Sequence, residues 1–234
     1  MGESRRTAEW WSRLGRVPRR TLAGCRRVVT PSYWVQFRAD LWWPLLLPGE
    51  VRSAVMSVEG TSSAREARLL AYLAWCSPPG GVWVEIGAWK GRTTTLLVEV
   101  ASRRADRPVV VSIDPHLRGT WESYRQTLGR FELERRGLEV HRARSDDVGP
   151  GFSRPISLLW VDGSHEYDDV VKDIALFTRW VVPGGYVVFD DAWGGHFPGV
   201  ERALGEWDAS AAGFDDLGAV KRFRLFRRRA HPRG

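Results

Sequence analysis

The sequence predicts an α/β protein in which the strands of a mostly parallel sheet alternate with helices. Two observations support this fold class. Short apolar runs such as 82–86 and 156–161 have the length and composition of strands that are buried on both faces. Longer segments between the runs carry apolar residues on one face only, at the helical period. Regular alternation of these two patterns is typical of a layered α/β sandwich.

The patterns along the chain predict the elements in order. A helix over 61–74 begins with Ser63 and Glu66 at capping-box spacing. Strand 82–86 and helix 92–103 follow a Pro-Pro-Gly-Gly stretch, and the segment Pro183-Gly184-Gly185 separates a later helix from its strand. The remaining predictions are strand 109–113, helix 120–136, strands 138–143 and 156–161, a helix carrying Val170 and Ile174, strand 186–189, helix 200–211, and closing strands 214–217 and 220–226 around Gly218.

The charge is distributed very unevenly. The chain has 234 residues, the length of one ordinary domain, and a formal net charge of +7. Residues 1–30 contribute eight Arg and two Glu, and residues 221–234 contribute seven Lys or Arg and no acid, so that 31–220 carry −6. An acidic body argues against a nucleic-acid partner. The basic ends are predicted to be solvated tails, with contact to phosphate or anionic lipid as the alternative.

Cys25 and Cys76 are the only cysteines, and their spacing fits neither a metal site nor a disulfide framework. The Arg-rich start lacks the apolar stretch of a secretory signal. The longest apolar patch, 41–47, is far shorter than the ~20 residues of a membrane-spanning helix. These features predict a cytoplasmic protein without a transmembrane segment.

The N-terminal 50 residues are predicted to form an arm or lid, separate from a domain over 51–234. Residues 1–30 are polar and Arg-rich, which favours a marginal helix or a disordered arm. Residues 31–48 are rich in Trp, Tyr and Phe and must pack against something. Two alternatives follow for this segment. One is a docking or subunit-interface element, which would make a homo-oligomer possible, and the other is a lid over a substrate pocket.

Acidic residues stand at the ends of the predicted strands. Right-handed crossovers bring the carboxyl ends of parallel strands to one edge of the sheet, where open α/β sheets bind ligands. We therefore expect five carboxylates to face one crevice: Glu85, Asp114, Asp146, Asp162 and Asp190.

A glycine loop follows the first strand. Gly87 and Gly91 allow the backbone to come close to a ligand. Glu85 precedes the loop and would repel a pyrophosphate, so a cationic or hydroxyl-rich ligand fits better. A plain tight turn is the alternative. Asp114, at the end of the next strand, is placed to accept hydrogen bonds from ribose hydroxyls, and Asp146 from an adenine amino group. Each aspartate alone could be a solvated loop residue, but together with the loop they indicate a nucleoside site.

Three stretches resemble class I S-adenosylmethionine-dependent methyltransferases: EIGAWKGRTT, SIDPH and LLWVDGSHEYDDVVKDI. The chain is most similar to the DGSHxY group, of the macrocin and mycinamicin O-methyltransferase type, over about residues 56–228. The resemblance implies a Rossmann-like three-layer sandwich with seven strands and an antiparallel C-terminal strand. It also implies that Glu85, Gly87, Gly91, Asp114, Asp146 and Asp162 bind S-adenosylmethionine, and that 56–60 cover it.

The residues that act on the hydroxyl acceptor of the methyl group are predicted at the ends of strands 156–161 and 186–189. Carboxylates are the ligands that Mg²⁺ prefers, and Asp162, Asp190 and Asp191 supply them. Metal-dependent O-methyltransferases, which this sequence resembles at these positions, carry a base three residues after the first carboxylate, and here that residue is His165. The alternatives are that His165 only orients its loop and that the aspartates act without a metal.

These features together predict a Mg²⁺-dependent O-methyltransferase that uses S-adenosylmethionine. Its acceptor is predicted to be a hydroxyl of a small molecule, such as the sugar or polyol of a secondary metabolite. A metal-independent methyltransferase is the first alternative. The second is a non-catalytic cofactor-binding protein that acts through its N-terminus as an interaction or membrane-surface module.

Overall fold

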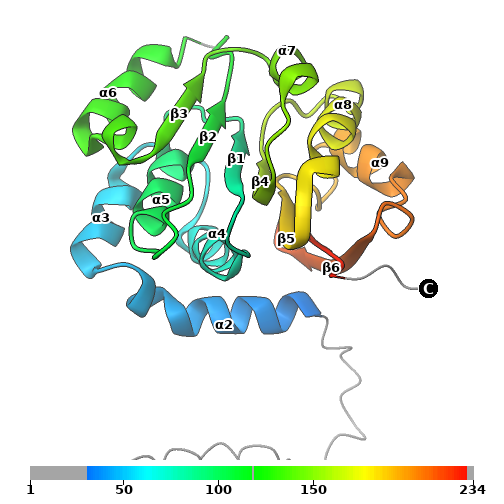
Figure 1. The fold of residues 1–234 in the computed structure, drawn as a ribbon, viewed down its shortest axis with the longest axis horizontal. Helices are drawn as coiled ribbons and strands as arrows, with labels where there is room; N and C mark the ends of the chain where they lie inside the picture. The colour runs from blue at the N-terminus through cyan, green and yellow to red at the C-terminus, as the bar shows by residue number, and fades with distance from the viewer. Residues whose placement is uncertain (1–30, 118, 231–234) are drawn as a thin grey trace, which may run out of the picture.

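A seven-stranded sheet forms the centre of the computed structural model, which describes residues 31–117 and 119–230 (Figure 1). The strand order is β3-β2-β1-β4-β5-β7-β6. The first five strands are parallel, and β7 runs antiparallel to both of its neighbours. The strands are β1 Val82–Ile86, β2 Val110–Ile113, β3 Leu138–His141, β4 Ile156–Val161, β5 Val181–Phe189, β6 Phe214–Val220 and β7 Phe223–Arg228. The predicted fold, with its antiparallel C-terminal strand, is confirmed.

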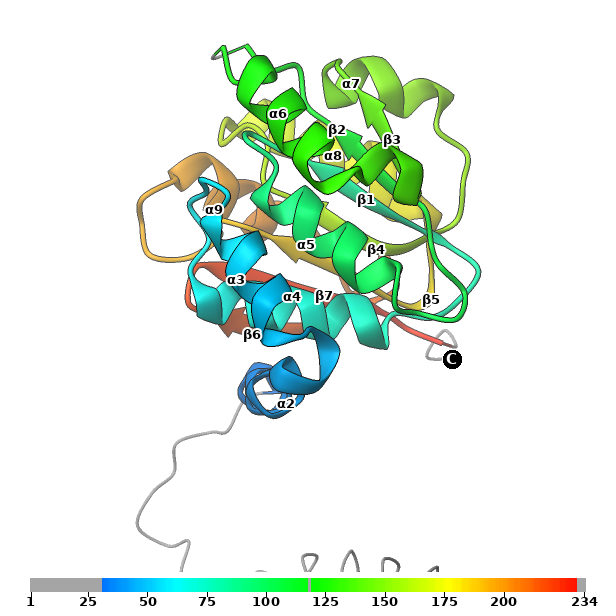
Figure 2. The ribbon, with the colours of Figure 1, turned by 90° about the vertical axis from the view of Figure 1, so that its left-hand side faces the viewer.

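Helices cover both faces of the sheet. Side chains alternate along each buried strand, so that Trp83 packs into one apolar core and Val84 into the other. The first core includes side chains of α4 and α5, and the second includes side chains of α8 and α9 (Figures 1 and 2). The helices that follow the N-terminal segment are α4 Ala64–Cys76, α5 Arg92–Ala101, α6 Trp121–Phe131, α7 Ser145–Val148, α8 Tyr167–Phe177 and α9 Pro198–Glu206.

The point where the strand order reverses lies between β1 and β4. From β1 the chain proceeds to β2 and β3 on one side, and it then returns to β4 on the other side. The loops after β1 and β4 therefore diverge, and a crevice opens between them at the carboxyl edge of the sheet. This topology brings the glycine loop and the 162–166 loop together.

Two helices precede the domain core. Helix α2 (Pro31–Leu46) packs on α4 and beside β6, and α3 (Gly49–Ser57) leads toward α4. The predicted boundary after residue 50 falls within the first turn of α3. The prediction for residues 1–30 lies outside the described residues.

The start of α4 agrees with its sequence pattern, whereas the closing hairpin differs from the prediction. The capping box of α4 is present, with Ser63 and Glu66 bonding each other's backbone N–H groups. In the hairpin, Gly218 lies at an irregularity within β6 rather than in the turn, and the turn is formed by Lys221 and Arg222. Lys221 has a φ of +53°, which reverses the chain at this point.

Within the described residues, no helix is long and apolar enough to cross a membrane.

Candidate functional site

A cavity of about 780 Å³ lies at the carboxyl edge of the sheet. Its volume is typical of small-molecule sites. Three loops that follow β1, β2 and β4 contribute most of its wall, together with 59–62 ahead of α4. Five of the residues predicted from the sequence line it: Gly87, Asp114, Asp162, His165 and Asp191. Four others do not: Glu85, Gly91, Asp146 and Asp190.

Gly87 is at the closest approach of the two loops. Its φ is +88°, and a Cβ at this position would lie 2.0 Å from the backbone oxygen of Asp162. A side chain is therefore excluded both by conformation and by space. Gly91, with a φ of +91°, starts α5, and its Cβ would touch Thr127 and Tyr124. Gly91 thus lets the helix begin close to α6 and does not line the cavity.

Asp114 joins the glycine loop to the next loop along the sheet. Its Oδ2 accepts hydrogen bonds from the backbone N–H groups of Ala88 and Trp89, each at 2.8 Å, and its Oδ1 accepts one from His116 at 2.6 Å. The carboxylate lines the cavity while it holds the loop in shape. Its predicted contact with a ribose would use the remaining lone pairs of the same oxygens.

Glu85 lies behind the cavity wall. The side chain is fully buried, and its Oε2 accepts hydrogen bonds from Thr94 Oγ1 at 2.5 Å and Ser112 Oγ at 2.8 Å. Burial raises the pKa of Glu85 to about 7, against the opposing effect of these two hydrogen bonds. Glu85 therefore links the end of β1 to α5 and β2. The sequence predicted that it contacts the cofactor directly, whereas the structure buries it behind the residues that line the cavity.

Asp146 lies beside the cavity, on its outer rim. It forms ion pairs with Arg144 at 2.9 Å and Lys172 at 3.0 Å, and the hydrogen bond from Arg144 is the largest of the effects that lower the pKa of its carboxyl. Its neighbours Arg144 and Ser145 line the cavity in its place. A contact between Asp146 and an adenine amino group remains a prediction.

Asp162, His165 and Asp191 form a cluster in the cavity wall. One oxygen or nitrogen atom from each lies within 4.8 Å of the others. Desolvation raises the pKa of Asp162 well above its ordinary value, and the charges of Asp190 and Asp191 add to this. Two carboxylates and an imidazole in this arrangement can bind a divalent cation or move a proton.

His165 is held on both sides. Its Nε2 lies 3.0 Å from Asp191 Oδ2, and its ring stacks on Phe197 with 4.0 Å between ring centroids. Gly199 lets the start of α9 come close to this loop, because a Cβ there would lie 2.4 Å from the His165 backbone oxygen. The imidazole therefore has a defined orientation at the cavity wall.

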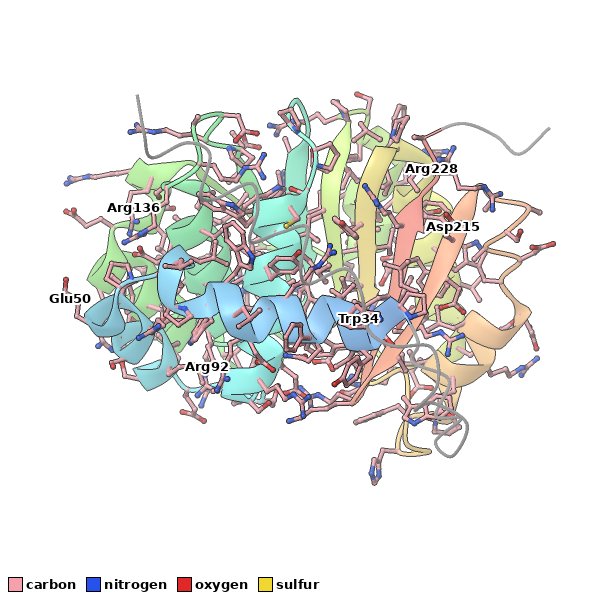
Figure 3. All side chains as sticks on the ribbon, turned by 90° about the horizontal axis from the view of Figure 1, so that it is seen from below. Trp34, Glu50, Arg92, Arg136, Asp215 and Arg228 are labelled. Carbon is pink, nitrogen blue, oxygen red and sulfur yellow. The ribbon has the colours of Figure 1, made fainter. Side chains whose placement is uncertain are left out.

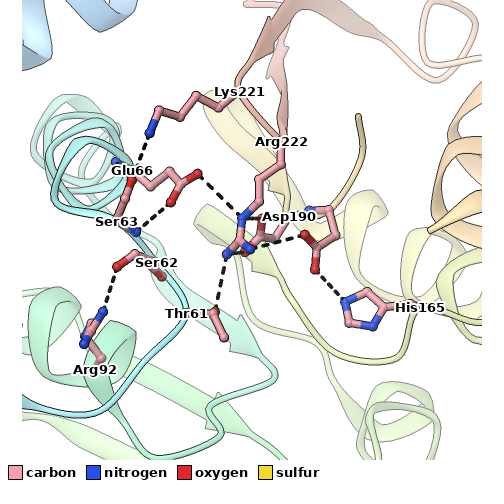
Figure 4. Close-up of polar contacts among 10 residues, drawn as sticks. Thr61, Ser62, Ser63, Glu66, Arg92, His165, Asp190, Lys221 and Arg222 are labelled. Carbon is pink, nitrogen blue, oxygen red and sulfur yellow. Dashed lines mark hydrogen bonds and ion pairs between the residues drawn. The ribbon is translucent and has the colours of Figure 1, made fainter. Parts of the chain in front are cut away.

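Asp190 lies outside this cluster and is paired with Arg222. The sequence analysis did not assign Arg222 to the site. Arg222 Nε lies 2.8 Å from Asp190 Oδ1, its Nη2 donates to Oδ2 at 2.9 Å, and its Nη1 lies 3.4 Å from Asp191 Oδ1. Figure 4 shows the guanidinium between Asp190, Glu66 and Thr61. Burial raises the pKa of Asp190 to about 6, although Arg222 opposes this. The sequence predicted Asp190 as a metal ligand, whereas in the structure its carboxylate is paired with the guanidinium of Arg222.

Arg92 was also missed, and it fastens the segment predicted to cover the cofactor. Its Nε donates to the Val58 carbonyl at 2.7 Å. Its Nη1 donates to the Ser62 carbonyl, also at 2.7 Å (Figure 4). Lys90 forms an ion pair with Glu59 at 2.6 Å. Residues 59–62 consequently form one wall of the cavity. The arginine at the start of α5 carried no distinguishing signal, because its partners are backbone carbonyls.

Comparison with known proteins shows what this chain is similar to. A family model described as a methyltransferase domain matches residues 84–192, which span the glycine loop, Asp114, and the cluster of Asp162, His165 and Asp191. An uncharacterized protein of Acanthamoeba polyphaga mimivirus is 27% identical over 115 residues, 47% of this chain. The chain spans about half the length of that relative.

Solved structures of O-methyltransferases share the architecture of the methyltransferase domain. The O-methyltransferase NovP matches with a TM-score of 0.59 and 17% identity, over 83% of this chain and 99% of NovP. TomG, an O-methyltransferase from Streptomyces achromogenes involved in tomaymycin synthesis, was solved with S-adenosylmethionine. It matches with a TM-score of 0.57 and 19% identity, over 85% and 98%. A TDP-rhamnose 3'-O-methyltransferase of calicheamicin biosynthesis matches with 0.53 and 15%, over 85% and 95%. The chain therefore shares its fold with these O-methyltransferases.

Proposed function

We propose that this chain is an S-adenosylmethionine-dependent O-methyltransferase that acts on a hydroxyl of a small molecule, a sugar or polyol. The observation that supports it best is His165, which Asp191 and Phe197 hold at the wall of a cavity that also contains the glycine loop. The similarity of residues 84–192 to a methyltransferase domain supports S-adenosylmethionine as the cofactor, as does the likeness to TomG, which was solved with that molecule. The sugar is supported by the structural likeness to a TDP-rhamnose 3'-O-methyltransferase.

The cofactor half of the site would be built from backbone. Gly87 lets a ligand approach the β1–α5 turn, Asp114 lines the wall at the ribose position, and residues 59–62 close the cavity from the side of α4. Asp162 adds a carboxylate where the two loops meet. When bound, S-adenosylmethionine supplies a methyl group on a sulfonium, and the acceptor oxygen that takes it up must lose a proton.

His165 would accept that proton. The 3.0 Å contact between its Nε2 and Asp191 favours the tautomer with the proton on Nε2, which leaves Nδ1 free to act as a base. Asp191 also stabilises the imidazolium that forms. Stacking on Phe197 fixes the ring plane, so the base is oriented before the acceptor arrives.

A divalent cation fits part of the predicted ligand set. Asp162 and Asp191 offer carboxylate oxygens within reach of one another, as Mg²⁺ requires, whereas Asp190 is held by Arg222. We therefore assign the metal to Asp162 and Asp191. A cation bound there would lower the pKa of the acceptor hydroxyl.

Arg222 favours a second candidate, a metal-independent methyltransferase. Its guanidinium lies at the cavity wall and compensates the charges of Asp190 and Asp191. A fixed positive charge in this position could stabilise the acceptor oxygen without a metal.

The test is methyl transfer to a panel of nucleotide sugars and polyols, followed by release of S-adenosylhomocysteine, with and without a chelator. We expect turnover that His165→Ala lowers by about 10²–10⁴-fold without weakening cofactor binding. His141→Ala, at the exposed end of β3, is the matched control. Unchanged turnover in His165→Ala excludes it as the base, and full activity under chelation favours the metal-independent candidate. Cofactor binding without transfer to any acceptor indicates a non-catalytic protein.

A further inference from the structure

Helix α2 presents a large apolar face to solvent. Its six exposed apolar side chains are between 44% and 77% accessible: Tyr33, Trp34, Phe37, Leu41, Trp42 and Leu45. The opposite face packs on the body through residues such as Ala39, Trp43 and Leu46. Figure 3 shows α2 lying across the outside of the molecule. A helix that is apolar on both sides requires a second covering surface.

This face takes no part in the cavity. Among the residues that the structure describes, none from 31 to 57 lines it. The prediction of a lid therefore has no support from the cavity wall. What remains is a docking surface for something outside the domain.

The area of this apolar face helps to decide whether a second copy of the chain or a membrane covers it. Six side chains at about half exposure offer roughly 600 Å² of apolar surface, at the upper end of the largest patch that a typical monomer exposes, and patches of this size are often functional. A second copy that packed on this helix alone would bury less than the ~800 Å² per partner of a stable protein interface. Binding to a membrane surface requires neither a complementary shape nor this minimum buried area.

The charges near the face point to an anionic partner. Arg38 is exposed on the helix, while Asp40, its only acidic residue, forms an ion pair with Arg68 at 3.3 Å. Residues 1–30, which join α2 directly at Pro31, carry eight Arg and only two Glu. An aromatic and leucine-rich face beside concentrated arginine is the composition of helices that lie in the interfacial layer of anionic membranes.

We propose that α2 docks this protein on an anionic membrane surface. Sixteen residues are too few to cross a bilayer, so the helix lies in the plane of the membrane. Trp and Tyr rings take positions at the level of the lipid headgroups. The basic composition of residues 1–30 matches the negative charge of such headgroups, and the body of the protein stays in water.

Co-sedimentation of the full chain with vesicles tests this proposal. We expect binding to vesicles of phosphatidylcholine with 30% phosphatidylglycerol, at least tenfold weaker binding to pure phosphatidylcholine, and partial release at high salt. The triple variant Trp34→Ser, Phe37→Ser, Trp42→Ser should reduce binding at least tenfold. These side chains are exposed, so the fold should be retained, as circular dichroism would verify. Trp193→Ser, which removes an equally exposed tryptophan from the loop after β5, is the matched control and should bind like the unmodified chain.

Two outcomes would overturn the proposal. One is failure of the full chain to bind the anionic vesicles. The other is vesicle binding that the triple variant leaves unchanged while sedimentation velocity shows a dimer converted to a monomer. In that case the face is covered by a second copy of the chain. Neither outcome depends on methyltransferase activity.

Discussion

The two halves of the cavity are built in different ways. The wall beneath the glycine loop is shaped by backbone, with Gly87 at positive φ and Asp114 accepting three backbone hydrogen bonds. The opposite wall contains the charged side chains of Asp162, His165, Asp191 and Arg222. Arg222 also pairs with Asp190, which is buried and does not line the cavity. The first half is therefore sensitive to shape and the second to charge.

The largest effect is expected at Gly87. Gly87→Ala would place a Cβ 2.0 Å from a backbone oxygen, so we expect loss of cofactor binding by more than 100-fold, or loss of the fold. Gly80→Ala is the matched control. Gly80 has almost the same φ, +87°, with nothing within 4 Å of its Cβ, so only strain of about 1 kcal/mol applies. Calorimetric titration with S-adenosylmethionine and thermal unfolding would measure both. Equal effects of the two substitutions would show that close packing at Gly87 is unimportant.

The second effect tests the charged half. Arg222→Gln leaves the buried Asp190 without its cation, and we expect a loss of about 3 kcal/mol in the free energy of unfolding. Arg224→Gln removes the partner of Asp216 in a more exposed pair, and a loss below about 1 kcal/mol is expected.

The same variant separates the two mechanisms. If Arg222 competes with a metal for Asp191, Arg222→Gln should bind Mg²⁺ or Mn²⁺ more tightly, as measured by titration calorimetry. If Arg222 itself serves the reaction, turnover should fall and added metal should not restore it. Unchanged stability and unchanged metal affinity would contradict the assignment of Arg222 as a compensating charge.

The third effect concerns Glu85 and depends on pH. Its pKa of about 7 in the folded chain exceeds the ordinary 4.5, so the folded state binds its proton more tightly. The stability contributed is fully present below pH 4.5 and is lost as pH rises through about 7. At about 1.4 kcal/mol per pH unit, the loss reaches roughly 3 kcal/mol at most. Glu85→Gln should lack this decline.

Urea unfolding from pH 4.5 to pH 8 would measure this decline in the free energy of unfolding. Burial also raises the pKa of Asp173 to about 7, but Asp173 is present in both proteins, so their difference isolates Glu85. The exposed Glu50→Gln is the control and should follow the unmodified chain. Parallel curves for Glu85→Gln and the unmodified chain would contradict the raised pKa of the buried Glu85.

Much of the fold could be predicted because it depends on local patterns. Apolar runs such as 156–161 have one stable place, a strand covered on both faces, and Ser63 with Glu66 marks a helix start through contacts three residues apart. The crossover rule then placed Gly87, Asp114, Asp162 and His165 at one edge. Each of these positions follows from the sequence and a general rule of chain geometry.

The predictions that changed depend on partners distant in sequence. Asp190 and Asp191 are adjacent in the chain, but Asp190 turns to Arg222, 32 residues away, and Asp191 turns to His165. Glu85 precedes the glycine loop directly, yet its side chain points to Ser112 on the neighbouring strand. Side-chain direction at a strand end is decided by which partner is near, and sequence spacing carries no information on that.

The sequence by itself determined the order of strands and helices, the edge of the sheet that bears the cavity, and the glycine at the closest approach of two loops. These follow from backbone conformation and from apolar periodicity, which are properties of short segments. Only the tertiary structure decided which carboxylates face the cavity and which are paired with arginine. It also showed that α2 keeps an apolar face in solvent, because burial is a property of the whole packed chain.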